Sequence, residues 1–138
     1  MNRFIPFLII VIFFASCGSG LEEENSEMRA KVIAVHDEVM PMMGKLKSLE
    51  KRAISEASEL EAESSSDSLK IQKLKSLAYD LEQAYEAMFV WMRQYDNENG
   101  ERSPEEVKAY LEEQMEKVKV VNENINAALN KAEKTLKD

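Results

Sequence analysis

Three long segments of this chain repeat apolar residues at alternating steps of three and four, and no other feature restricts the fold as strongly. Such steps return to one face of an α-helix, whereas a half-buried strand needs alternation with period two. The average step of about 3.5 residues is that of a coiled-coil seam, which flanking apolar positions widen into a bundle face. The seam positions of the three segments are, in order, Met28, Val32, Val35, Val39, Met42, Leu46, Leu49 and Ala53; Ile71, Leu74, Ala78, Leu81, Tyr85, Met88, Met92 and Tyr95; and Val107, Leu111, Val118, Val121, Ile125, Ala128 and Ala132.

Two polar stretches, ESSSDS at 63–68 and DNENGERS at 96–103, separate these segments. The second stretch ends in a serine cap, with proline at the first helical position and glutamate three residues after the cap, so a helix begins at Ser103. Three helices joined by short loops pack most simply as an antiparallel up-down-up three-helix bundle, and the predicted fold class is all-α. The alternative is a longer rod that closes its core only by forming a homo-oligomer.

Pro41 interrupts the first of these helices. Its nitrogen cannot donate to the carbonyl of Asp37, and its ring disfavours helical geometry at Met40. Gly44 follows three residues later. The first helix is therefore predicted to be kinked near Pro41.

The N-terminal residues differ from the rest of the chain. After Arg3 comes FIPFLIIVIFF, an apolar run well short of the ~20 residues that span a bilayer, which is typical of a signal peptide. Ala15 and Ser16 then stand directly before Cys17, the only cysteine. This arrangement resembles the lipobox of bacterial lipoproteins, although Phe14 departs from the usual aliphatic residue.

The lipobox resemblance implies that signal peptidase II removes residues 1–16 and that Cys17 carries fatty acyl chains, palmitate among them, on its thiol and its new amine. Two or more acyl chains anchor a protein stably. Gly18 after the cysteine favours the outer membrane, on either its periplasmic or its cell-surface side. Residues 17–25 are predicted to form a lipidated flexible tether, and residues 26–138 the helical bundle domain.

Charge and composition exclude several functions. Without residues 1–16 the chain has 26 acidic and 17 basic residues, a formal charge of −9, which repels phosphate backbones and anionic headgroups. Nucleic acid is therefore not a predicted partner, and the lipid is the predicted membrane contact. A single histidine, an acylated cysteine and four glycines offer neither an activated nucleophile nor a phosphate-binding loop. The chain is predicted not to be an enzyme.

The stretch AVHDEVMPMMGKL holds the only histidine and three methionines. If the first two helices are antiparallel, Met40 lies level with Met88, and His36 with Met92. Imidazole and thioethers are soft ligands, so His36, Met40, Met43, Met88 and Met92 form an alternative Cu(I) site. Haem held by His36 and a methionine is a weaker alternative, since the chain lacks small residues that would make room for it. The favoured interpretation is packing around the kink, with no cofactor.

Three stretches, HDEVMPMMGKLKSL, AMFVWMRQYD and YLEEQMEKVKVVNENINAALNKAEKTL, resemble a family of small uncharacterised lipoproteins from Bacteroidota, some of which are labelled "viral A-type inclusion protein". The resemblance covers nearly all of the chain after Cys17. It implies a helical lipoprotein and carries no activity.

These patterns predict a non-catalytic helical interaction module that is held on the membrane and binds another envelope protein. Phe89, Val90 and Trp91 are consecutive, so they cannot all face inward on a helix. They are therefore the predicted partner-binding residues. The alternative function is soft-metal binding by the histidine and methionine set.

We expect intact-mass spectrometry of the mature protein, isolated from its own membrane, to show a chain that begins at Cys17 and carries acyl groups on the thiol and the amine. The reason is that the lipobox resemblance places both cleavage and acylation at this residue. An unmodified thiol at Cys17 would contradict the prediction.

Overall fold

The structure, a computed structural model, describes residues 18–63 and 67–137, and it is helical. α1 (Gly18–Val39), the 3₁₀ helix η1 (Met40–Met42) and α2 (Met43–Ala62) follow one another, and α3 (Ser68–Gln94) and α4 (Pro104–Thr135) complete the fold. The all-α prediction is confirmed for these residues, among which no strand occurs. The predicted signal peptide and the lipidation at Cys17 lie outside the described residues.

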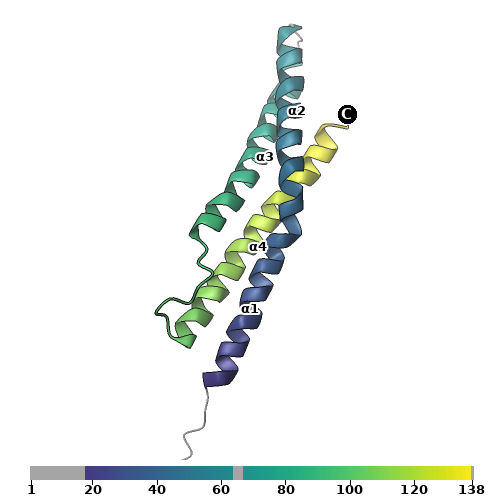
Figure 1. The fold of residues 1–138 in the computed structure, drawn as a ribbon. Helices are drawn as coiled ribbons and strands as arrows, with labels where there is room; N and C mark the ends of the chain where they lie inside the picture. The colour runs from purple at the N-terminus through teal and green to yellow at the C-terminus, as the bar shows by residue number, and fades with distance from the viewer. Residues whose placement is uncertain (1–17, 64–66, 138) are drawn as a thin grey trace, which may run out of the picture.

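α1, η1 and α2 together form one rod that the other two helices share (Figure 1). α3 packs along α2, α4 packs along α1, and α3 and α4 also pack against each other. Each of the two shorter helices therefore covers a different half of the rod. Within residues 18–63 and 67–137, no helix has the length and apolar character needed to cross a membrane.

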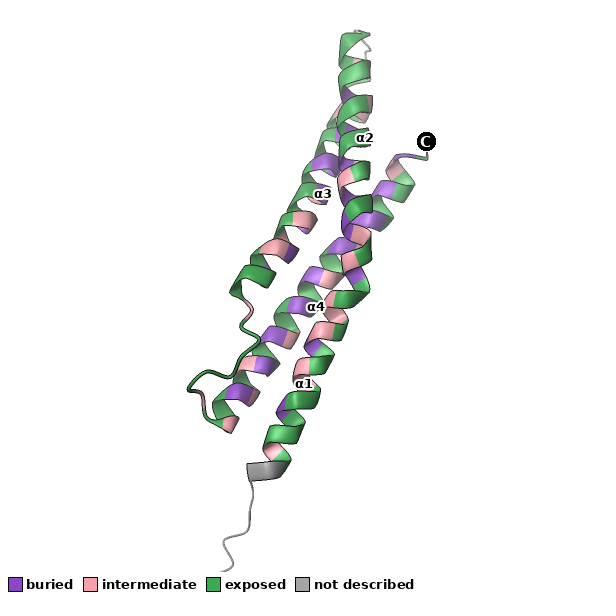
Figure 2. Ribbon diagram, in the orientation of Figure 1, coloured by how far each residue is buried: buried purple, intermediate pink, exposed green. Residues whose placement is uncertain are grey.

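The core runs along the predicted seams (Figure 2). Burial of these apolar side chains is the main favourable contribution to folding, because the described residues contain no cysteine that could form a disulfide. Met92, which the spacing also placed in the seam, is instead 39% exposed, so that prediction is wrong. The largest fully buried side chains are Val32, Val39, Leu46, Leu74, Leu77, Leu81, Met88, Val107, Leu111, Val118 and Ile125.

The start of α4 matches its sequence signature. The Ser103 hydroxyl accepts a hydrogen bond from the backbone N–H of Glu106 at 3.3 Å, and the Glu106 carboxylate accepts one from the backbone N–H of Ser103 at 2.7 Å. Pro104 follows the cap. Both N–H groups, which helix geometry leaves without a carbonyl partner, are thus satisfied, and the predicted helix start is confirmed.

The first helix begins earlier in the chain than the sequence predicts. Helix α1 begins at Gly18, so it includes residues 18–25, which the sequence placed in a flexible tether. Asn25 is buried and its side-chain nitrogen donates to the carbonyl oxygen of Pro104 at 2.7 Å, while Glu24 pairs with Lys108 at 3.3 Å. These contacts with α4 extend the helix toward the N-terminus.

The backbone at Pro41 departs from α-helical geometry. Met40–Met42 form a 3₁₀ turn between α1 and α2, and Pro41 is exposed within it. A proline in this place removes one backbone donor, and tighter 3₁₀ hydrogen bonding is a common local response.

Replacement of Leu81 by alanine should lower the free energy of unfolding by about 2–5 kcal/mol, because the side chain is fully buried and its loss leaves a cavity. Leu69→Ala, on the same helix but at a position 61% exposed, is the matched control and should change the free energy by no more than about 0.5 kcal/mol. Urea unfolding followed by circular dichroism measures both. Equal losses in the two variants would contradict the core described above.

Candidate functional site

Four rings from three parts of the chain form what we call the aromatic layer: His36, Trp91, Tyr95 and Tyr110. His36 lies on α1, Trp91 on α3, Tyr95 directly after α3, and Tyr110 on α4. The ring centroids of His36 and Trp91 are 5.7 Å apart, those of Trp91 and Tyr95 4.8 Å, and those of Tyr95 and Tyr110 6.2 Å. The layer therefore joins α1 to α4 by way of the end of α3.

His36 has a polarised and largely buried imidazole. Its side chain is 16% exposed, and Nδ1 lies 2.8 Å from the carboxylate oxygen Oδ1 of Asp37. Since a carboxylate only accepts hydrogen bonds, Nδ1 carries the proton and the lone pair of the neutral ring is at Nε2. Nε2 is buried and has no hydrogen-bond partner among the described residues. The acceptor nitrogen thus lies in the protein interior.

Two more polar atoms lie in apolar surroundings: Trp91 Nε1 in the layer, and Gln114 Oε1 on α4, one turn after Tyr110. Both are buried without a hydrogen-bond partner among the described residues, and each such group costs about 1–3 kcal/mol. Burial raises the pKa of the Tyr95 hydroxyl above its ordinary value, and nearby Arg29 acts in the opposite direction. Polar groups held at this cost mark the layer as a candidate functional site.

The loop between α3 and α4 closes one end of the layer. Arg29 donates to the carbonyl oxygen of Asp96 at 3.3 Å and to the side chain of Asn99 at 2.5 Å. The Asp96 backbone N–H donates to the Tyr110 hydroxyl at 2.6 Å, and Arg102 pairs with the Asp96 carboxylate at 3.0 Å. A loop N–H and then the Arg102 guanidinium hold the pKa of Asp96 below its ordinary value. Sequence reasoning did not identify Arg29, because no local pattern connects it with a loop 67 residues away.

Two contacts fix where Met88 lies. On α3, Met88 stands between Trp91, which touches His36, and Tyr85, whose ring lies 5.0 Å from Lys47 Nζ. Met88 is fully buried in the core, and its level along α3 corresponds to a level of the rod between residues 36 and 47, that of Met40 and Met43.

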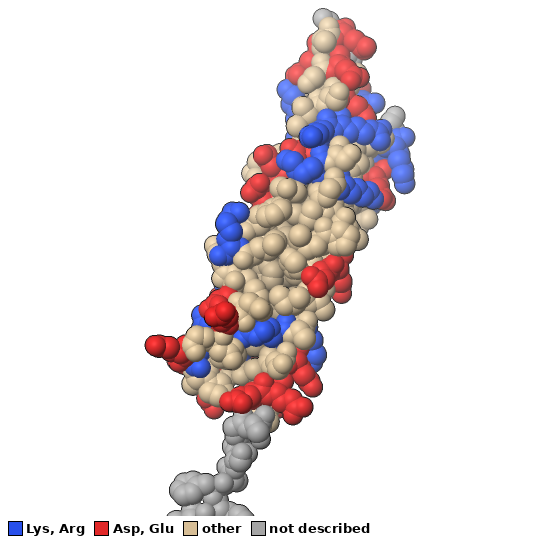
Figure 3. Space-filling view, in the orientation of Figure 1, with Lys and Arg blue, Asp and Glu red and all other residues tan. Residues whose placement is uncertain are grey.

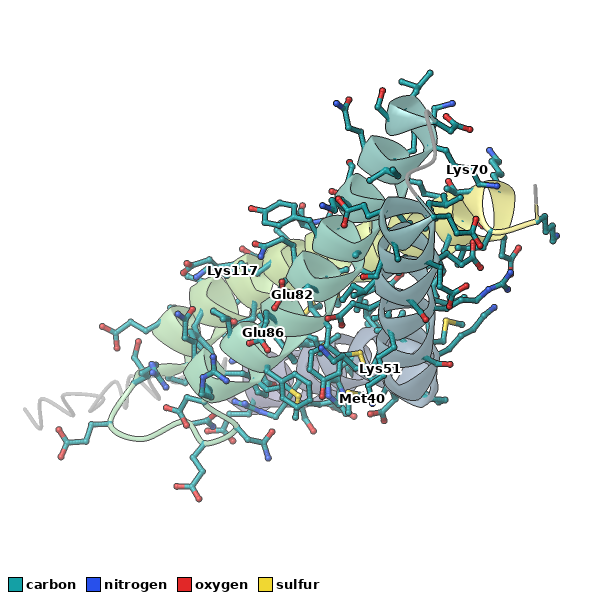
Figure 4. The ribbon with its side chains drawn as sticks, turned by 90° about the horizontal axis from the view of Figure 1, so that it is seen from above. Met40, Lys51, Lys70, Glu82, Glu86 and Lys117 are labelled. Atoms are coloured by element: carbon teal, nitrogen blue, oxygen red, sulfur yellow. The ribbon has the colours of Figure 1, made fainter. Side chains whose placement is uncertain are left out.

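The methionines divide into two groups. Met43 is 6% exposed, and Met40 is half-buried at the junction of α1 and α2, where Figure 4 labels it. These two share a level with Met88. Met92 is exposed and does not belong to this group, although the sequence placed it level with His36; the His36 ring contacts Trp91, the residue before Met92.

A second feature is an apolar hollow of about 530 Å³ between α3 and α4, which continues past Gln83 and Ala87 into a neighbouring hollow of about 450 Å³. We call the two together the α3/α4 groove. Val90 is 41% exposed and Val120 54% exposed in it. Figure 4 labels Glu86 on α3 and Lys117 on α4, both of which line the first hollow. The lining residues of the two hollows are Gln83, Glu86, Ala87, Val90, Trp91, Gln94, Glu116, Lys117, Val120 and Val121, then Asp80, Ala84, Asn124, Ala127, Ala128 and Lys131.

The face shown in Figure 3 carries its charges mainly toward the two ends of the molecule. The middle of this face is largely free of Lys, Arg, Asp and Glu side chains. On α4, the middle stretch VVNENINAALN contains a single charged residue, Glu123. The surface around the middle of α4 is therefore less strongly hydrated than the ends.

The three predicted contact residues have different environments. Val90 is exposed and lines the groove, and Phe89 is half-buried with its ring 4.8 Å from that of Tyr85. Trp91 is only 5% exposed, so it is the one of the three consecutive residues that faces inward. Val120 is a groove residue that sequence reasoning missed, although its place beside the seam residue Val121 could have identified it.

Among the described residues, no three His, Cys, Asp or Glu side chains are grouped so that they could hold a metal ion. A soft-metal site would therefore depend on the thioethers around His36. In comparisons with known proteins, no family model, no curated protein and no solved structure matches this chain.

Trp91 is the single tryptophan of the chain, which makes its environment measurable. We expect its fluorescence emission at short wavelength and weak quenching by acrylamide, because the indole is packed between His36 and Tyr95. Urea-unfolded protein is the control and should be quenched strongly. Strong quenching of the folded protein would contradict the burial of Trp91.

Proposed function

We propose that this chain is a lipid-anchored protein of the bacterial outer membrane, without catalytic activity, whose helical domain binds another envelope protein through the α3/α4 groove. The observation that carries the proposal is the apolar groove itself, with Val90 and Val120 exposed in it. Apolar side chains gathered in a hollow on an otherwise charged surface are typical of an interaction site.

The dimensions of the groove suit an α-helix. Its α3 side extends from Asp80 to Gln94, a rise of about 21 Å at 1.5 Å per residue. Small side chains at Ala84, Ala87 and Ala127 allow close approach of a partner backbone. A helix laid along this groove would cover the exposed valines, as in other helix-in-groove complexes.

The charges favour a basic partner over a second copy of the chain. Lys117 is paired with Glu113 at 2.6 Å, and Lys131 with Asp80 at 2.5 Å, so the two lysines of the groove are already neutralised within the chain. Glu116 is likewise paired, with Lys119 at 3.7 Å, and Glu86 also lines the groove of a chain whose net charge is −8. A two-fold dimer through the groove would bring like carboxylates together. The partner is therefore an amphipathic helix whose apolar stripe is flanked by Lys or Arg.

The proposal also includes the relative directions of the helices and the bend in the rod. The rod, α3 and α4 form an antiparallel up-down-up bundle with a bend at Pro41, supported by the short connections and by the pairing of α2 with α3 and α1 with α4. The lipid on Cys17 holds this bundle at the membrane, on the periplasmic or the cell-surface side. The rigid groove is thereby presented at a short distance from the bilayer.

A photo-crosslinking residue placed at Val90 or Val120 in living cells should trap one discrete partner. Mass spectrometry should map the linked peptide to an amphipathic, net basic helix of another protein. Ile54, which is 49% exposed on α2 and does not line the groove, is the matched control position and should not give that adduct. Val120→Glu should abolish the adduct formed from Val90, whereas Ile54→Glu should leave it.

Two results would overturn the proposal. One is a continuous range of weak adducts with abundant neighbours from both groove positions. The other is a linked peptide from a second copy of this chain, which would assign the groove to self-association.

A further inference from the structure

We propose that His36, Met88 and one of Met40 and Met43 bind a single Cu(I) ion between the rod and α3, in a site separate from the α3/α4 groove. The inference does not depend on the docking proposal, since none of the four residues lines that groove. It is carried by three observations: a buried imidazole nitrogen without a partner among the described residues, thioethers of the same core within one to two helical turns of its level, and an apolar enclosure.

The nitrogen ligand is Nε2 of His36. Asp37 accepts the proton of Nδ1 at 2.8 Å, so the lone pair of Nε2 is free, buried and fixed in direction. A carboxylate on the far nitrogen is the usual support of a metal-binding histidine, because it sets the tautomer and makes the ligand more basic.

The sulfur ligands follow from helix geometry. Met88 lies one turn, or about 4.5 Å, along α3 from Trp91, whose ring contacts His36. Met40 and Met43 lie one to two turns along the rod from His36, on the side of the Lys47–Tyr85 contact. Met88 is fully buried, Met43 is 6% exposed and Met40 half-buried, so these thioethers reach the core between α3 and the rod.

The donor set selects the ion. One imidazole and two thioethers are soft, uncharged ligands that suit Cu(I), whereas Mg²⁺, Ca²⁺ and Mn²⁺ prefer carboxylate and carbonyl oxygens. The Trp91 indole packs beside His36 and is itself almost fully buried, so it restricts the access of water to the site. A monovalent ion also brings less charge into this apolar region than a divalent one, which lowers the cost of its desolvation.

Cu(I) titration of the full chain in detergent, in competition with bicinchoninate, tests the proposal. The chain carries Cys17→Ser for this measurement, so that the thiol cannot bind the ion. We expect one Cu(I) per chain, together with quenching of Trp91 fluorescence. Met88→Leu and His36→Gln should each weaken binding at least tenfold, and Asp37→Asn should weaken it by about tenfold through its effect on the ring.

Met92→Leu is the matched control, because Met92 is on the same helix but 39% exposed, and its affinity should be unchanged. Exchange of methionine for leucine conserves volume and usually costs less than about 1.5 kcal/mol, so Met88→Leu should still fold, as circular dichroism would verify. As a second measurement, Ag(I) should shift the NMR methyl signal of Met88 and that of Met40 or Met43, and leave the signal of Met92 in place.

The proposal is overturned if the chain does not compete for Cu(I) at micromolar concentration. It is equally overturned if Met88→Leu retains the affinity, or if Met92→Leu loses as much as Met88→Leu. Unchanged methyl signals of Met88 in the presence of Ag(I) would lead to the same conclusion. None of these outcomes bears on whether Val90 and Val120 contact a protein partner.

Discussion

The fold depends on the burial of three apolar seams against one another within a single small domain. The helices present leucine, valine and alanine along one face and charged residues along the other, so each becomes stable only where a neighbour covers its seam. The rod made by α1, η1 and α2 is longer than either of its neighbours, and two helices share it. α3 covers mainly one half and α4 mainly the other, and the two also pack against each other, from the Tyr95–Tyr110 contact to the Lys131–Asp80 ion pair.

At the junction of α1 and α2 the backbone and nearby buried polar groups depart from regular helix geometry and hydrogen bonding. The α-helical hydrogen bonding of the rod changes at Met40–Met42, and one turn away the buried ring nitrogens His36 Nε2 and Trp91 Nε1 have no hydrogen-bond partner among the described residues. Deviations of this kind lower stability, and proteins tend to keep them at functional sites. A row of leucines would pack more stably at the same level. The aromatic layer, Met40 and Met88 are therefore the part of the core whose residue types packing alone explains least well.

Trp91 connects the two proposed sites. Its ring contacts His36 in the aromatic layer, and it also lines the α3/α4 groove beside Val90 and Val121. A helix bound in the groove would press against the same side chain that shields the histidine.

The sequence by itself determined the helices, most of their buried positions and the cap at Ser103, because these depend on spacing and on hydrogen bonds between residues close together in the chain. It also pointed to the level shared by His36, Met40 and Met88. Only the tertiary structure decided that Trp91 faces inward and Val90 outward, that Met92 is exposed, and that Val120 lines a groove. A spacing of 3.5 residues shows which broad face of a helix is apolar, but it does not show which residues at the edge of that face are buried. Contacts with neighbouring helices decide this, because they set the rotation of each helix about its axis. The start of α1 at Gly18 was decided in the same way, by contacts of Glu24 and Asn25 with α4, a helix some 80 residues farther along the chain.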